Sequence, residues 1–77
     1  MTEDTWGSVQ HALQKSVGQN NYVTWIEPLR FAEFTNGVVR FEVPTSFIGN
    51  WVARNYKDQI LKHLISAGAN VNRIEFD

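Results

Sequence analysis

The sequence contains no cysteine, and this absence excludes disulfide bonds and thiolate metal ligands. It also lacks any run of roughly 18 consecutive apolar residues, the length that a membrane span needs. The N-terminal segment has neither the basic stretch nor the apolar stretch of a secretory signal. These absences predict a cytoplasmic protein without a membrane partner.

An excess of either charge is absent as well. Seven lysines and arginines stand against eight aspartates and glutamates, which gives a formal net charge of -1. Binding to nucleic acid through counterion release needs a concentrated basic face. Such a face is therefore limited to a local patch of Arg54, Lys57, Lys62 and Arg73, and the alternative is that these are ordinary solvated charges.

Apolar residues are abundant in this short chain. They make up 43% of its 77 residues, which is enough for a hydrophobic core without disulfide or metal cross-links. A chain of this size is only marginally able to bury its apolar surface, so the bulky side chains are expected to stabilise the fold. We expect a single domain over residues 1–77.

The first segment has the periodicity of an amphipathic helix. Its apolar residues recur at spacings of three and four, at Trp6, Val9, Leu13 and Val17. Gly18 supplies the left-handed residue that commonly follows a helix. We predict a helix over residues 3–17.

A short helix is predicted next, with Asn20 or Asn21 as its N-cap. Its apolar face consists of Tyr22, Trp25 and Ile26. Pro28 has no amide hydrogen and disfavours a helical conformation in the residue before it, so the helix ends there. Trp25 is expected to be a buried anchor, because so short a helix is marginal by itself.

Two alternating segments flank the pair Asn36-Gly37. This pair is the strongest short signal for a β-hairpin, because a type I′ turn needs two positive φ values. In the second strand Val39, Phe41 and Val43 alternate with polar residues. We predict a hairpin that packs one face on the core and exposes the other to water.

Thr45 is predicted to be the N-cap of one long helix that ends near Gly68. About twenty residues would make this helix roughly 30 Å long. Residues 71–76 alternate as a strand, which must pair with the hairpin to satisfy its backbone. The resulting order, ααββαβ, predicts an α+β fold in which helices pack on one three-stranded sheet.

The sequence offers no constellation of catalytic or metal-binding residues. His11 and His63 lie on different predicted helices, whereas a metal site needs three or four convergent donors. The serines have no base at a suggestive spacing, and there is no glycine-rich phosphate loop. We therefore expect no enzymatic activity, no cofactor and no metal site.

Several motifs together resemble the N-terminal domain, or domain I, of the DnaA family of bacterial chromosomal replication initiators. They are Trp6, "WIEPL" at 25–29, the Asn-Gly hairpin, "VPTSFIGNWVARNY" at 43–56 and "RIEF" at 73–76. The resemblance covers nearly the whole chain. It implies a small KH-like α+β interaction module that is part of a longer initiator, in which ATPase and duplex-DNA-binding domains follow.

The resemblance also implies partners and contact residues. In this family the module self-associates weakly, docks the replicative helicase DnaB and receives initiator-regulating proteins, and some members bind single-stranded DNA weakly. A self-association tryptophan is matched by Trp6, which we expect to be exposed in the first turn of its helix, the alternative being a core anchor. Helicase and regulator contacts are matched by Asn21 and Phe47, although many relatives carry an acidic residue where Asn21 stands. Phe47 is expected to be partly exposed at the start of the long helix, the alternative being burial against Trp51.

These observations favour a module for oligomerisation and partner docking that raises the local concentration of initiators at a replication origin. Trp25 and Trp51 are assigned to the core of its fold. The alternative function is weak KH-like binding of single-stranded nucleic acid by Arg54, Lys57, Lys62 and Arg73. However, the GxxG loop with which a KH domain holds a strand is absent.

Overall fold

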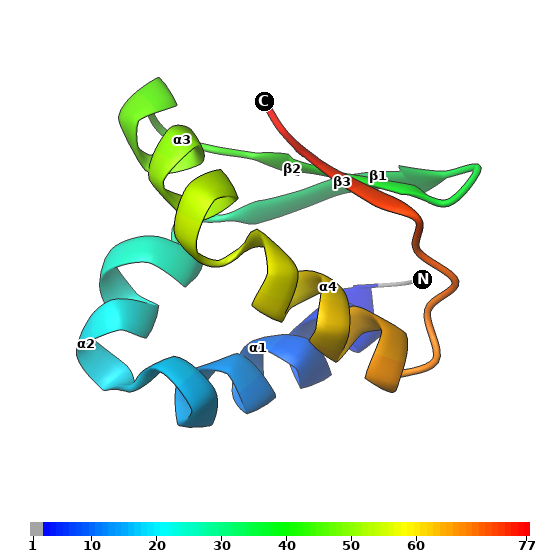
Figure 1. Cartoon of the computed structure of the whole chain (residues 1–77), viewed down its shortest axis with the longest axis horizontal. Helices are drawn as coiled ribbons and strands as arrows, with labels where there is room; N and C mark the ends of the chain where they lie inside the picture. Colours follow the sequence, from blue (N-terminus) through cyan, green and yellow to red (C-terminus); the bar gives the residue numbers. More distant parts are fainter. Residues whose placement is uncertain (1–2) are drawn as a thin grey trace.

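The computed structural model of the chain describes residues 3–77 (Figure 1). Its elements, in order, are α1 (Glu3–Val17), α2 (Gln19–Asn21), η1 (Tyr22–Ile26), β1 (Arg30–Thr35), β2 (Val38–Glu42), α3 (Ser46–Asn55), α4 (Lys57–Ser66) and β3 (Arg73–Phe76). Segments α2 and η1 form one short helical unit, and α3 and α4 occupy the predicted long helix. The predicted ααββαβ order of an α+β fold is confirmed.

The three strands form one mixed sheet in the order β1-β2-β3. The hairpin strands β1 and β2 are antiparallel, and β3 runs parallel to β2. The prediction that the last strand pairs with the hairpin to satisfy its backbone is confirmed. Asn36 and Gly37 have φ values of 52° and 80°, which confirms the predicted turn. A β-bulge between Phe31 and Glu33 adds an irregularity to β1 that the sequence pattern did not indicate.

Helices α1 and α4 lie on one face of the sheet, and α3 lies beside the end of the strands (Figure 1). The core lies between the two layers and includes Trp6, Val9, Leu13, Ile26, Leu29, Val39, Phe41, Val52, Ile60, Leu64, Val71 and Ile74. Phe41 lies at its centre, with its ring centroid 4.5 Å from Trp6 and 5.8 Å from Phe76. The predicted alternation of β2 is confirmed, because Val39 and Phe41 are buried while Glu42 is exposed.

The prediction of one long helix after Thr45 is wrong, because Tyr56 separates α3 from α4. Tyr56 has a φ of -124° and a ψ of -7°, which lie outside the helical range. The side-chain amide of the preceding residue, Asn55, donates a hydrogen bond to the carbonyl of Trp51 at 2.9 Å. Asparagine weakens a helix in this way, because its side chain competes for backbone partners. The two predicted ends are confirmed: the Thr45 hydroxyl accepts from the amide of Ile48, and Gly68 has a φ of 92°.

The predicted asparagine cap of the short helix is wrong. Gly18 occupies the N-cap position without a side-chain hydrogen bond, and Asn21 donates from its side chain to the carbonyl of Val17 at 3.0 Å. The helix then widens into a π turn, in which the amide of Glu27 donates to the carbonyl of Tyr22 at 2.8 Å. It ends before Pro28, as predicted.

Gly18 joins the two first helices in a conformation that only glycine adopts readily. Its φ of 89° and ψ of 156° lie far from the left-handed helical values that we expected. We expect Gly18→Ala to lower the free energy of unfolding by about 1–3 kcal/mol. Gly7→Ala is the matched control: Gly7 lies inside α1 with open space around its Cβ position, so alanine should stabilise the fold by about 0.5–1 kcal/mol. Urea denaturation of both variants tests the pair, and equal effects would contradict the assignment.

Candidate docking surface

Three aromatic side chains from two helices form a continuous group at the surface. The rings of Trp25 and Trp51 are stacked, with centroids 4.9 Å apart and an angle of 19° between the planes. The ring of Phe47 is tilted against Trp25 at a centroid distance of 6.0 Å. We call Trp25, Phe47 and Trp51 the aromatic surface.

Local sequence positions these rings. Thr45 begins α3, so Phe47 falls in the first turn of that helix and Trp51 lies one turn further along the same side. Trp25 comes from η1, which packs against α3. The corner at Pro28 ends η1 and sends the chain into β1. The short helix and the start of α3 thereby present their aromatic residues together.

The aromatic surface is open to solvent to a degree that the sequence did not indicate. Phe47 is 66% exposed, so its predicted accessibility is confirmed. Trp51 is 41% exposed, so its assignment to the core is wrong. Trp25 is half-buried and packs against the edge of the core, so its assignment holds in part. Spacing of four residues correctly aligned Phe47 with Trp51, but it could not tell that, within the described residues, η1 covers this side of α3 only in part.

Asn21 lies in the same helical unit as Trp25, four residues before it, and is exposed. Its side-chain amide donates to the carbonyl of Val17, which ties the short helix to the end of α1, and its side-chain oxygen can still accept a hydrogen bond. Nearby, partial burial raises the pKa of the Tyr22 hydroxyl above its ordinary value, and the charge of Glu27 raises it further. Tyr22 therefore stays neutral at physiological pH.

Trp6 is buried, with 5% of its surface exposed, so the expectation that its ring is accessible is wrong. Its ring packs against Phe41 in the centre of the core. The first turn of a terminal helix is covered in this fold because α1 runs beneath the sheet (Figure 1). A direct contact between the Trp6 ring and a second molecule would need this ring to leave the core.

The structure does not gather the four candidate cations into one groove. Lys57 lines a groove between α3 and β3, Lys62 lines a different groove along α4, and the residues of these two grooves do not overlap. Arg73 forms an ion pair with Glu75 on its own strand. Arg54 is exposed in the last turn of α3. A continuous basic track for a nucleic-acid strand is therefore not formed by these residues.

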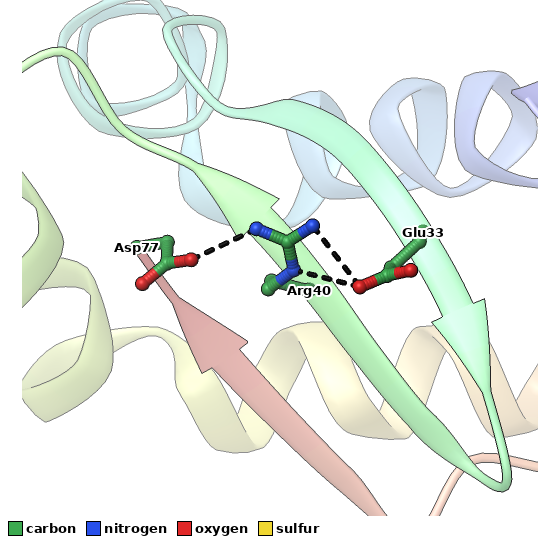
Figure 2. A network of polar contacts seen from close by, with 3 residues as sticks. All are labelled: Glu33, Arg40 and Asp77. Carbon is green, nitrogen blue, oxygen red and sulfur yellow. Dashed lines mark hydrogen bonds and ion pairs between the residues drawn. The ribbon is translucent and has the colours of Figure 1, made fainter.

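The open face of the sheet carries charges of both signs. Figure 2 shows Arg40 of β2 between Glu33 and Asp77, at 3.0 Å and 2.8 Å from their carboxylate oxygens. Hydrogen bonds from Arg40 to Asp77 and then to Glu33 raise the pKa of this guanidinium. Because Arg40 is neutralised by two carboxylates, it offers a polyanion little to bind.

Residues 3–77 contain neither a cluster of metal ligands nor a membrane-spanning helix. Within this range no group of three or more histidine, aspartate or glutamate side chains is arranged to hold a metal ion. No helix in the same range is long and apolar enough to cross a membrane. The aromatic surface is thus the candidate site with the clearest physical character.

Comparison with known proteins agrees with the fold and with the motifs around this surface. The family model of the DnaA N-terminal domain matches residues 3–66, which include α1, η1 and α3. The chain belongs to the DnaA N-terminal domain family. The resemblance predicted from the sequence motifs is confirmed.

Individual relatives of this DnaA N-terminal domain are curated as chromosomal replication initiator protein DnaA. The chain is 55% identical to the protein of Cereibacter sphaeroides, over 99% of the chain and 17% of that protein. It is 51% identical to the protein of Ruegeria pomeroyi, over 99% of the chain and 16% of that protein. The relative from Geotalea uraniireducens is 34% identical over 96% of the chain. The chain thus spans about a sixth of the length of these relatives and corresponds to one domain of a replication initiator.

Proposed function

We propose that this DnaA N-terminal domain is a protein-interaction module that docks the replicative helicase DnaB and initiator-regulating proteins through its aromatic surface. The observation that carries the proposal is the exposure of Phe47 on top of the stacked Trp25 and Trp51. Exposed aromatic groups of this kind are typical anchors of protein interfaces, where tryptophan and tyrosine dominate the binding energy. The module works by binding, without catalysing a reaction, in the bacterial cytoplasm.

The rigidity of the aromatic surface favours this role. Trp51 and Phe47 lie on one capped helix, and the stack with Trp25 restricts their side-chain rotation before a partner arrives. Preorganised side chains lose less conformational entropy on binding. Burial of the exposed ring of Phe47 by a partner therefore contributes hydrophobic free energy in proportion to the buried area, and its entropic cost is small.

The second part of the proposed function is weak self-association. The initiators of the relatives are several times longer than this chain, and DNA-bound initiators would hold many copies of the domain close together. A contact too weak to join two free domains becomes effective at such a local concentration. The domain would then help to order initiators at an origin while leaving the assembly reversible.

The proposal is tested by titrating isotope-labelled domain with the helicase of the same bacterium and recording amide NMR spectra. We expect the largest shifts at and around Trp25, Phe47 and Trp51, with the indole signals of both tryptophans included. Shifts confined to the outer face of the sheet, around Arg40, would contradict the assignment.

A parallel titration with single-stranded oligonucleotides at low salt tests the alternative function, which predicts shifts around Arg54 and Lys57 that vanish as salt rises.

A further inference from the structure

Large apolar side chains that are exposed among residues 3–77 mark the surfaces that remain open to a partner. Phe47 and Trp51 belong to the aromatic surface, and Val23 lies on η1, the helix that carries Trp25. Ile65, which is 54% exposed, lies on α4 instead. Because Trp6 is buried, α4 is the place where a second apolar contact is available.

Four residues of α4 lie on one side of the helix and line a single shallow groove. Asp58, Leu61, Lys62 and Ile65 have the spacings of three and four that place side chains on one helix face, and we call them the α4 face. Leu61 and Ile65 form its apolar part. Neither Asp58 nor Lys62 forms an ion pair with another of the described residues, so both charges are available to a partner.

We propose that the α4 face is the self-association surface, and that it binds the same face of a second copy of this chain in an antiparallel arrangement. With a two-fold axis between Leu61 and Lys62, Ile65 of each copy lies about 5 Å along the helix axis from Leu61 of the other, since a helix rises about 1.5 Å per residue. Asp58 of each copy lies equally near Lys62 of the other. This inference rests on the weak self-association included in the proposed function.

The charges of the α4 face select a second copy as its occupant. One aspartate and one lysine make the face neutral and complementary to itself once it is turned by a two-fold axis. In the antiparallel arrangement the two Asp58 residues lie about 10 Å apart along the helix axis, whereas a parallel arrangement would place them level with each other, which is unfavourable. The apolar part consists of two side chains, so the contact is small and weak, as reversible assembly on a shared template requires.

Dilution of the labelled chain from about a millimolar to tens of micromolar tests the apolar part, because weak self-association falls in this range. We expect concentration-dependent amide shifts along residues 58–66. Ile65→Ser should weaken self-association by about tenfold or more in Kd, since it removes the most exposed apolar group of the face. Val23→Ser is the matched control, because it removes a similarly exposed apolar side chain from η1, and it should leave the dilution shifts unchanged.

Charge reversal tests the antiparallel geometry independently. Asp58→Lys places two lysines at each contact and Lys62→Asp places two aspartates there, so each variant alone should lose its concentration-dependent shifts. An equimolar mixture of the two variants restores opposite charges at both contacts and should recover self-association. A mixture that stays monomeric while the unchanged chain self-associates would overturn the antiparallel pairing.

Failure of this inference can be told apart from failure of the proposed function. If the unchanged chain shows concentration-dependent shifts elsewhere, or if Ile65→Ser leaves them intact, the α4 face is excluded while self-association stands. If the unchanged chain shows none over the whole range, the self-association part of the proposed function fails together with the α4 face. Docking of helicase to the aromatic surface is measured separately and is affected by neither result.

Discussion

Replacement of Trp6 by alanine is expected to lower the free energy of unfolding by about 3–5 kcal/mol, the range for large buried aromatic side chains. Trp6 is 5% exposed and its ring lies 4.5 Å from that of Phe41, so alanine would leave a cavity in the centre of the core. In a domain of this size that loss is a large part of the total stability. Guanidinium denaturation followed by circular dichroism measures it.

Two further variants separate stability from contact at this position. Trp6→Phe keeps an aromatic ring against Phe41 and should lose much less stability than Trp6→Ala. Phe47→Ala removes an exposed ring and should change the free energy of unfolding by less than about 1 kcal/mol. If Trp6→Ala kept full stability and lost self-association, Trp6 would be a contact residue, and the burial described for it would be contradicted.

Phe47→Ala is expected to weaken binding of the replicative helicase by about 30-fold or more, equivalent to the 2 kcal/mol that defines an interface hot spot. Phe47 is the most exposed member of the aromatic surface, and its ring rests on Trp25, which holds it in place for a partner. The effect should arise mainly from faster dissociation. Biolayer interferometry with immobilised helicase measures both the dissociation constant and the dissociation rate.

The matched control for this measurement is Ile65→Ala. Ile65 is exposed to a similar degree but lies on α4, away from the aromatic surface, so its loss should leave helicase binding unchanged. Trp51→Ala should weaken binding as well, since it removes the support of Trp25. Equal binding by the Phe47→Ala variant and the unchanged chain would remove the aromatic surface from the proposed docking function.

Local signals in the sequence were sufficient for most of the secondary structure. Asn36-Gly37 predicted the hairpin because few residues besides glycine and asparagine adopt positive φ without strain. The Thr45 cap and the stop at Pro28 were predicted for equally local reasons. The break at Tyr56 was missed because the apolar spacing of the predicted helix continues through it without interruption. The hydrogen bond from the Asn55 side chain, which accompanies the break and competes with backbone hydrogen bonding, does not alter that spacing.

Short motifs were enough to predict the family, and local conformational preferences with residue spacing were enough to predict the order of the elements and which residues of a helix or strand share a face. Tertiary structure decided which of those faces are covered. Trp6 is buried because α1 runs beneath the sheet, and Trp51 stays 41% exposed because, within residues 3–77, Trp25 of η1 covers only part of its ring. Burial of a side chain depends on which other elements pack against it, and the spacing of residues along one element carries no information about those elements.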